Sequence, residues 1–385
     1  MATRKLYYED CHLCRFTARV TQCTPREDGG WSVVLDETAF YPEGGGQACD
    51  IGTLDGVPVT DVQEEGELVV HRCAAPLAPG RQVEGLVDYP RRFDLMQQHT
   101  GEHILSGLLH SRFGCHNVGF HMGAELVTVD FDTPIPSEAL PEIEAQANRA
   151  VWRNLPVLCR YPAPEELERL PYRTKRALPW PVRIVEIPGI DRCACCGVHV
   201  ASTGEVGLIK IFSVEKFRSG VRMEMACGER ALNYLSAAFE QNRQVSQAFS
   251  AKILATGEAA RRMNQALAEE KFRSAGLRRE VFQALAREYA GAGDVLLFRE
   301  GLSSGELMEL ADAVAGSCGG TAAVFTSGDG GTFRYCLTTH VPGGDLRELG
   351  RRMNGALKGR GGGKSAFQQG SVRASREEIG AFFQK

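Results

Sequence analysis

Two short motifs, far apart in the chain, carry residues that can bind a metal ion. His99 and His103 have i, i+4 spacing, which places both imidazoles on one face of a helix, where they can reach the same cation. Cys195 and His199 add a thiolate and a third imidazole. This mixed nitrogen and sulfur set suits Zn²⁺ better than Mg²⁺ or Ca²⁺. The sequence therefore predicts a zinc site made of His99, His103, Cys195 and His199.

Neighbouring residues leave the sulfur ligand open. Cys193 and Cys196 flank Cys195, and each is a candidate for the ligating thiolate. Glu102 stands just before the second histidine of the first motif, whereas HExxH zinc proteases carry a glutamate directly after the first histidine. The order of residues thus argues against that class of protease, and Glu102 is interpreted as a supporting or solvent-facing residue.

The residues around the first motif predict the helix that must position it. Asp88 can cap the helix and Pro90 is tolerated in its first turn. Apolar residues recur at helical spacing after them, and Gly114 offers a stop.

Composition limits the class of protein. The chain has 385 residues, of which 43% are hydrophobic and 24% charged, and it is expected to form two or three soluble domains. No apolar run is long enough to span a bilayer, and the first residues lack the apolar stretch of a secretory signal. The 13 cysteines are odd in number and irregular in position, which favours reduced thiols and a cytoplasmic protein. The net charge of -4 means that a nucleic-acid partner would have to be held by local basic patches.

Patterning predicts an α+β protein with four segments. Residues 1–86 contain short β-prone runs typical of a small β-barrel. Residues 87–235 mix helices and strands and carry all four candidate ligands. Residues 236–290 favour one or two long helices, which would act as a spacer or as the interface of a homodimer. Residues 291–385 alternate strands and helices, as expected of an α/β domain.

The last segment contains a glycine-rich run, Lys358–Gly370. From Gly344 to Lys385 there are nine Lys and Arg residues against four Asp and Glu residues. Glycines let backbone amides approach a phosphate, and Arg360 and Lys364 would supply positive charge. The run is predicted to be a loop that binds phosphates; a solvated turn, or a domain that mediates assembly, remains the alternative.

Four motifs, taken together, indicate a family. They are TAFYPEGGGQ at Thr38–Gln47, HTGEH at His99–His103, the CxxxH motif with the following VASTGE at Cys195–Glu205, and GVRME at Gly220–Glu224. In this order the chain resembles the free-standing alanyl-tRNA editing proteins of the AlaX type, which are related to the editing domain of alanyl-tRNA synthetase. The glycine-rich tail resembles the C-terminal domain of that synthetase, which indicates the long form of the family.

The resemblance implies a zinc-dependent hydrolase that deacylates mischarged tRNA(Ala), chiefly Ser-tRNA(Ala) and also Gly-tRNA(Ala). Thr38 would sense the hydroxyl of the wrong amino acid, and Gln47 would line the aminoacyl pocket. Further substrate-binding residues implied in the motifs and the tail are Gly44, Gly45, Gly46, Arg222, Arg360 and Lys364. The chain departs from the usual CGGTH, because Cys196 and Val198 replace a glycine and a threonine.

Two other functions remain open at this point. The four ligands would also close a structural zinc site in a tRNA-binding module without hydrolase activity. Editing of a threonyl-type mischarged tRNA is the second alternative, since the editing domain of that synthetase uses related metal motifs. The sequence does not decide whether zinc activates water or only positions the substrate.

Overall fold

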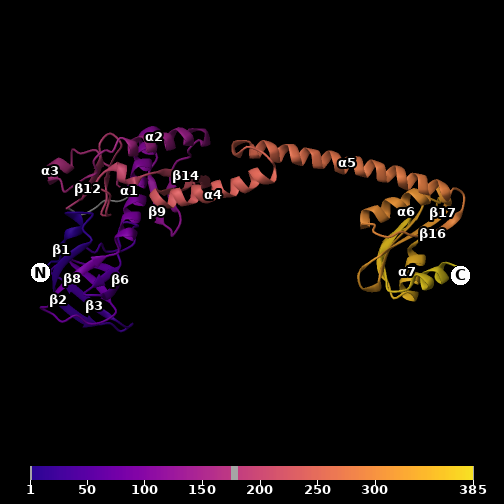
Figure 1. Ribbon diagram of the computed structural model, residues 1–385, viewed down its shortest axis with the longest axis horizontal. Helices are drawn as coiled ribbons and strands as arrows, with labels where there is room; N and C mark the ends of the chain where they lie inside the picture. The colour runs from indigo at the N-terminus through magenta and orange to yellow at the C-terminus, as the bar shows by residue number, and fades with distance from the viewer. Residues whose placement is uncertain (1, 175–180, 385) are drawn as a thin grey trace. The chain divides into compact units, whose positions relative to one another are not determined.

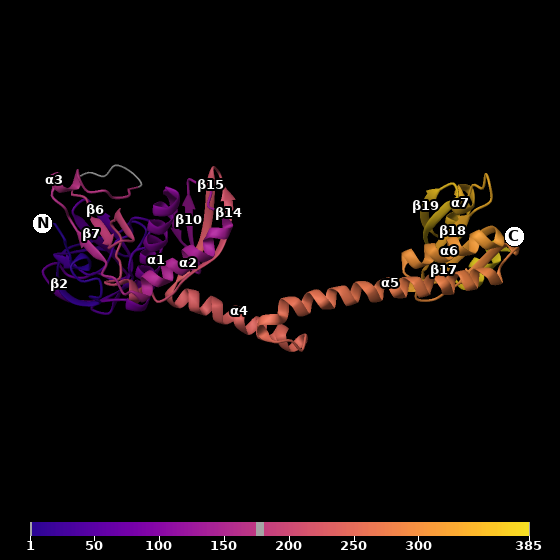
Figure 2. The ribbon, with the colours of Figure 1, turned by 90° about the horizontal axis from the view of Figure 1, so that it is seen from above.

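The computed structural model describes residues 2–174 and 181–384. The chain folds into two compact units, Met1–Gln244 and Val245–Lys385 (Figures 1 and 2). Both units mix helices and strands, which confirms the predicted α+β class. The finer division at residues 86, 235 and 290 stays a prediction. Among the described residues, no helix is long and apolar enough to cross a membrane.

The first unit begins with short strands and continues with alternating helices and strands. Its strands are β1 (Arg4–Lys5), β2 (Arg15–Pro25), β3 (Trp31–Leu35), β4 (Glu37–Thr38), β5 (Gly52–Leu54), β6 (Val57–Glu65), β7 (Leu68–Cys73), β8 (Gln82–Val87), β9 (Asn117–Met122), β10 (Val127–Phe131), β11 (Leu158–Arg160), β12 (Ile184–Ile187), β13 (Asp191–Ala194), β14 (Ile209–Phe217) and β15 (Gly220–Cys227). Its helices are α1 (Tyr89–Phe113), α2 (Leu140–Trp152) and α3 (Pro164–Leu167), with 3-10 turns at Leu6–Tyr8, Ser137–Ala139 and Thr203–Val206.

Six strands close into a barrel in the order β2-β3-β7-β6-β5-β8. Along β2, Phe16, Ala18 and Val20 are buried while the residues between them are exposed, because successive side chains of a strand point to opposite faces. Gly85 lies opposite Phe16, and a Cβ there would meet the Phe16 ring at 2.3 Å. The missing side chain leaves room for the aromatic ring in the narrow interior. Closure also removes free strand edges from this part of the unit.

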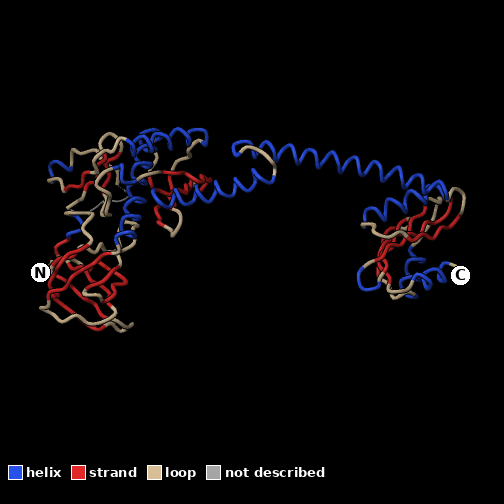
Figure 3. Tube along the Cα trace, in the orientation of Figure 1, coloured by secondary structure: helices blue, strands red, loops and turns tan. Residues whose placement is uncertain are grey.

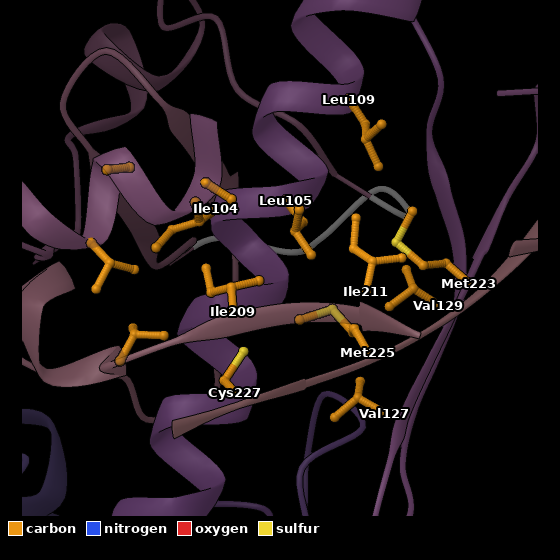
Figure 4. Close-up of a cluster of buried hydrophobic side chains, with 14 of the residues drawn as sticks. Ile104, Leu105, Leu109, Val127, Val129, Ile209, Ile211, Met223, Met225 and Cys227 are labelled. Carbon is orange, nitrogen blue, oxygen red and sulfur yellow. The ribbon is translucent and has the colours of Figure 1, made fainter. Parts of the chain in front are cut away.

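Helix α1 anchors the rest of the first unit. As predicted, Asp88 caps its start by accepting a hydrogen bond from Arg91 N, and Gly114 ends it in the left-handed conformation. The helix packs against the antiparallel sheet β14-β15-β10-β9. Figure 4 shows Leu105 of α1 beside side chains of that sheet such as Ile211, and both belong to one buried cluster. Each large apolar side chain buried in this way contributes about 1.5–3 kcal/mol, so α1 is firmly held.

The second unit is built on one mixed sheet. The helix α4 (Gly228–Ala248) crosses the boundary between the units, and a 3-10 turn at Ile253–Ala255 precedes α5 (Thr256–Glu288) (Figure 3). Helix α5 lies within the segment 236–290 predicted to be helical, whereas α4 begins eight residues before it. The strands are β16 (Gly293–Phe298), β17 (Gly319–Ser327), β18 (Phe333–Thr339), β19 (Arg360–Lys364) and β20 (Phe367–Val372), in the order β16-β17-β18-β20-β19. The remaining helices are α6 (Ser304–Cys318), α7 (Arg347–Ala356) and α8 (Arg376–Phe383), with a 3-10 turn at Asp329–Gly331.

The glycine-rich run is a strand and not the predicted loop. Its residues form β19 and the first part of β20, which pairs with β19 at the edge of the sheet. A Cβ at Gly361 or Gly363 would lie 2.3 Å or 2.2 Å from a carbonyl oxygen of β20. The glycines therefore allow the two strands to pair closely. A run with so few side chains shows no alternation of apolar and polar residues, so the sequence pattern could not reveal this strand.

Candidate metal centre

The structure brings the four predicted ligands together. His99 and His103 lie on α1, and Cys195 and His199 lie just after β13. One potential ligand atom from each of them lies within 4.8 Å of the others. Cys195 Sγ is 3.4 Å from Nε2 of His99 and 3.4 Å from Nε2 of His199. Tetrahedral zinc separates neighbouring ligand atoms by roughly 3.3–3.6 Å, so these residues fit Zn²⁺.

Each imidazole of the centre is oriented through its other nitrogen. The Nδ1 contacts are His99 to Gln47 Oε1 at 2.9 Å, His103 to Asp191 Oδ2 at 3.0 Å, and His199 to Thr100 Oγ1 at 3.1 Å. All three partners are oxygens that accept a hydrogen bond when Nδ1 carries the proton. That tautomer leaves the Nε2 lone pair for a metal, which is the arrangement found around most metal-binding histidines.

Asp191 is a functional residue that the sequence patterns did not reveal. Its carboxylate accepts from Arg173 Nε at 2.7 Å and Arg173 Nη2 at 2.9 Å, in addition to His103. Burial opposes its ionisation, but the hydrogen bonds from His103 and Arg173 lower the pKa of Asp191 to about 2. A Cβ at Gly107 would lie 2.7 Å from Asp191 Cβ, so this glycine lets β13 approach α1. The only signal in the sequence is a carboxylate near Cys195.

Burial and neighbouring groups shift the pKa values of three of the proposed ligands. Burial raises the pKa of the Cys195 thiol, but His99, His199 and His103 together hold it well below its usual range. Burial and the nearby His99 lower the pKa of His199 to about 3. Burial also lowers the pKa of His103, yet hydrogen bonds with Asp191 and Cys195 raise it well above its usual range. A metal bound here would require the thiolate form of Cys195 and an unprotonated Nε2 on His103, so metal binding would be coupled to proton release.

The other two sulfur candidates have different surroundings. Cys193 groups with His103 and Asp191, whereas Cys196 is exposed and belongs to neither candidate metal group among the described residues. Cys195 is the cysteine that joins all three histidines. Gly197 follows, and a Cβ there would lie 2.1 Å from His99 Cε1. The loop can close over His99 only because position 197 has no side chain.

The predicted glycine loop is a tight turn that presents Gln47. Gly44 and Gln47 exchange backbone hydrogen bonds of 3.1 and 3.0 Å, and Gly45 and Gly46 between them have φ of 60° and 85°. Two successive residues with positive φ strongly favour glycine. Gln47 Oε1 accepts from His99 Nδ1 and also from Val198 N at 3.1 Å. This leaves Gln47 Nε2 as a buried donor without a partner in the described part of the chain.

A buried ion pair fixes this turn against α1. Arg92 and Asp50 are each 1% exposed, and Arg92 Nε donates to Asp50 Oδ1 at 2.8 Å. Arg92 Nη2 also donates to the carbonyl of Ala39, and Asp50 accepts from Tyr41 N. Removing one partner of such a pair costs about 3–5 kcal/mol because a buried charge is left alone. The pair therefore holds the residues on both sides of the turn, Ala39 and Asp50, against α1.

A pocket of about 170 Å³ adjoins the metal ligands. Its lining combines ligands, the glycine turn and polar groups: Gly45, His99, Glu102, His103, Asn117, Arg173, Thr174, Cys193, Ala194, Cys195 and Cys196. The buried Glu102 is part of this wall and is a supporting residue, not a solvent-facing one. Such a concave site with converging polar groups is the usual form of a small-ligand pocket.

Other predicted site residues lie elsewhere. Neither Thr38 nor Arg222 is among the described residues that line the pocket. Thr38 is fully buried; its hydroxyl contacts His71 Nε2 at 2.8 Å and accepts from the backbone N–H of Phe40. Arg222 on β15 donates two hydrogen bonds to the carboxylate of Asp130 on β10, at 2.7 and 2.8 Å.

The two basic residues predicted to bind tRNA lie in the second unit. Arg360 and Lys364 are exposed at the two ends of β19.

Comparison with known proteins gives the class to which this centre and fold belong. Residues 182–222 match the threonyl and alanyl tRNA synthetase second additional domain, and residues 2–91 match the class II (A) tRNA synthetases. The first match contains the predicted cysteine and histidine ligands of the second motif.

Relatives over nearly the whole chain define the family. Alanyl-tRNA editing protein Aarsd1-A of Xenopus laevis is 30% identical over 400 residues, covering 98% of this chain and 96% of the relative. Aarsd1 of Mus musculus is 29% identical over 96% of this chain and 95% of its own. The alanine–tRNA ligase of Pyrococcus abyssi is 32% identical over 96% of this chain and 42% of its own. The chain belongs to the alanyl-tRNA editing proteins, which confirms the resemblance seen in its motifs.

A solved structure is also similar, but more distantly. The C-Ala domain from Aquifex aeolicus alanyl-tRNA synthetase covers 25% of this chain and 92% of its own length, with 19% identity and a TM-score of 0.22. A likeness of this size supports no conclusion about this chain.

Proposed function

We propose that the protein is a zinc-dependent aminoacyl-tRNA hydrolase that removes the wrong amino acid, chiefly serine and also glycine, from mischarged tRNA(Ala). The observation that carries this proposal is the pocket against His99, His103 and Cys195. The names of the relatives support the substrate class, because they are alanyl-tRNA editing proteins. In the reaction, water adds to the ester carbonyl and the amino acid leaves the terminal ribose.

The proposed ligands are His99, His103, Cys195 and His199. A bound Zn²⁺ would supply a Lewis acid that polarises an oxygen ligand or lowers the pKa of water. Gln47 holds His99 through Oε1, and its buried Nε2 is the proposed donor to the substrate. Gln47 itself is not among the described residues that line the pocket. The glycine turn Gly44–Gly46 brings Gln47 into place and contributes Gly45 to the pocket wall.

Discrimination between serine and alanine would come from polar groups that need the serine hydroxyl. A site built to bind a hydroxyl rejects the analogue that lacks it, since its buried polar groups would be left unpaired. Thr38 is proposed to sense that hydroxyl. The Thr38 hydroxyl contacts His71 Nε2 and accepts from Phe40 N–H, so this role requires its remaining hydrogen-bonding capacity to reach the substrate.

A panel of purified mischarged tRNAs tests the activity. The zinc-loaded protein is expected to deacylate Ser-tRNA(Ala) fastest, Gly-tRNA(Ala) more slowly and Ala-tRNA(Ala) least, with no effect on a threonyl-type mischarged tRNA. His103→Ala should abolish turnover and lower zinc content. His116→Ala is the matched control, because His116 also pairs with an aspartate, Asp132 at 3.1 Å, but is exposed and outside the pocket.

The second candidate is a tRNA-binding module with a structural zinc site. It is favoured by the presence of four protein ligands, because catalytic zinc sites commonly keep one position for water or substrate. This candidate predicts full zinc content, tRNA binding and no deacylation of any ester. The same panel therefore separates the two functions.

The second unit is proposed to bind the body of the tRNA. Support comes from Arg360 and Lys364, which are exposed on the edge strand β19 in a segment with an excess of positive charge. Contacts to phosphates position a nucleic acid with little sequence readout and weaken with salt. A homodimer is the competing role, supported by exposed apolar residues at helical spacing on α5, such as Met263 and Leu267. Measurement of tRNA affinity and of oligomeric state distinguishes these roles.

A further inference from the structure

Two side chains from distant segments hold three successive carbonyl groups of the loop that carries Cys195. Arg183 Nη1 donates to the carbonyl oxygens of Cys195 at 3.0 Å and Gly197 at 2.8 Å. Tyr8 Oη donates to the carbonyl oxygen between them, that of Cys196, at 2.7 Å. Arg183 is buried, and its Cζ lies 4.5 Å from the centre of the Tyr8 ring, a cation–π contact that keeps the two side chains together. The backbone of residues 195–197 is therefore fixed in orientation.

The N–H groups of the same three peptides point to the opposite side, because the C=O and N–H of a planar trans peptide are antiparallel. Gly197 N–H, opposite the carbonyl of Cys196, donates to Cys195 Sγ at 3.3 Å. Val198 N–H, opposite the carbonyl of Gly197, donates to Gln47 Oε1 at 3.1 Å. The first N–H of the series, that of Cys196, forms no hydrogen bond with another residue of the described chain. One backbone donor on the side of the proposed ligands is therefore left for another group.

This donor belongs to a residue of the pocket wall. Cys196 lines the pocket together with His99 and Cys195. A fixed N–H group without a protein partner, in a pocket where an ester is cleaved, is the kind of donor that forms an oxyanion hole. A backbone donor does not depend on the side chain, so it is compatible with a cysteine at position 196 in place of the glycine that is usual in the family.

We infer that the backbone N–H of Cys196 binds the carbonyl oxygen of the aminoacyl ester as negative charge develops on it, and that Arg183 and Tyr8 position this N–H. The inference rests on the proposed hydrolase function and assigns a catalytic group to it. Arg183 and Tyr8 act through the backbone and are positioning residues.

The reaction shows when this hydrogen bond matters. As the water oxygen bonds to the ester carbon, one electron pair of the C=O bond moves onto the carbonyl oxygen. The pair returns when the bond to the ribose oxygen breaks, and the ribose oxygen takes up the proton that the water has lost. A hydrogen bond to a charged oxygen is stronger than one to the neutral ester. The N–H of Cys196 therefore stabilises the transition state more than the bound ester, so its loss should lower kcat and leave KM nearly unchanged.

Replacement of one backbone amide by an ester tests the donor itself. Lactic acid is the hydroxy analogue of alanine, so a chain with lactic acid at position 196 differs from the Cys196→Ala variant by an ester oxygen in place of the N–H. Both are assayed as zinc-loaded full chains on Ser-tRNA(Ala), with zinc content measured in each. The kcat of the ester-containing chain should be about 100- to 1,000-fold below that of Cys196→Ala, the range for loss of one oxyanion donor, at a similar KM.

Side-chain variants test the positioning. Arg183→Lys keeps the charge, and Tyr8→Phe keeps the ring but loses the hydroxyl. Each should lower kcat by about three- to tenfold, the range for one hydrogen bond, with one zinc per chain and a similar KM. Tyr161→Phe is the control, since Tyr161 is exposed and its hydroxyl holds none of the three carbonyls. An ester also weakens the carbonyl of Cys195 as an acceptor for Arg183. A loss in the ester-containing chain no larger than that in Arg183→Lys would therefore overturn the inference.

The outcomes separate this inference from the proposed function. If the unmodified protein hydrolyses Ser-tRNA(Ala) and the ester-containing chain is as fast as Cys196→Ala, the hydrolase stands and the inference is refuted. If the unmodified zinc-loaded protein hydrolyses no ester, the proposed function fails and the inference fails with it. If the ester-containing chain does not fold, Arg183→Lys and Tyr8→Phe decide, and an unchanged kcat in both refutes the inference.

Discussion

Replacement of Asp191 by asparagine should weaken zinc binding without removing a ligand. Asp191 accepts from His103 Nδ1 at 3.0 Å and from two nitrogens of Arg173 at 2.7 and 2.9 Å. Asparagine has one oxygen in place of two. If that oxygen faces His103, the amide NH₂ meets the N–H groups of Arg173; if it faces Arg173, the NH₂ meets the proton of His103. Either arrangement leaves donors facing donors.

The size of the effect follows from the role of this hydrogen bond. Partners that hold metal-binding histidines contribute about 10- to 100-fold in metal affinity, which corresponds to about 1.4–2.7 kcal/mol. Asp191→Asn should lie in this range, because the ring of His103 stays in place on α1 but is deprived of the acceptor that fixes its tautomer. Loss of His103 itself should cost more.

Zinc affinity is measured by competition with a chromophoric chelator, with the variant and the unmodified protein at the same pH. Asp130→Asn is a close control, since Asp130 accepts from Nε and Nη2 of Arg222 at 2.7 and 2.8 Å but contacts none of the proposed ligands. It should keep the zinc affinity of the unmodified protein. If Asp191→Asn bound zinc as tightly as Asp130→Asn, orientation of His103 by Asp191 would be irrelevant to the centre.

Three further predictions concern other parts of the molecule. Gly197→Ala places a Cβ 2.1 Å from His99 Cε1, so zinc titration should show weaker binding, and denaturant unfolding should show a loss of about 1–3 kcal/mol. Burial lowers the pKa of His71 from 6.5 to about 4, so the unfolded chain takes up this proton at a higher pH than the folded chain does. The free energy of unfolding should therefore fall by about 3 kcal/mol as the pH drops from about 6.5 to about 4, and level off below that. A His71→Gln variant should lack this pH-dependent part of the stability. The double variant Arg360→Ala, Lys364→Ala should bind tRNA more weakly. The slope of log affinity against log salt concentration should become shallower by about one for each phosphate that the protein no longer neutralises. An unchanged slope would show that β19 does not contact the tRNA.

Local patterns in the sequence predicted the elements with clear period or clear ends. The helix around the first motif has a capping aspartate, a proline in its first turn and a terminal glycine, and all three act as expected in α1. The β-prone runs of the first segment form strands of the barrel because alternation and turn residues are local signals. The i, i+4 histidines lie close to the later cysteine and histidine, as expected from residue types that can share a metal.

Interactions between distant segments could not be predicted in the same way. Asp191 reaches His103 because Gly107 lets β13 approach α1, and neither the approach nor the partner is encoded by a local pattern. Thr38 lies in a recognisable motif, yet its hydroxyl faces His71, which belongs to another strand of the barrel. The glycine-rich tail has almost no side chains to show a period, which is why strand β19 resembled a loop.

Helix α1 shows why the metal centre and the fold depend on each other. Its buried face carries many polar side chains, and burial of a polar group is unfavourable unless it is hydrogen-bonded. Arg92 is satisfied by Asp50, Gln98 by the backbone of Cys227, and His103 by Asp191, each from a different part of the first unit. These hydrogen bonds fix the distance of α1 from the glycine turn, the sheet and β13. A metal bound to residues of α1 and of the loop after β13 would join two of these attachments directly, so its removal should lower the free energy of unfolding of the first unit.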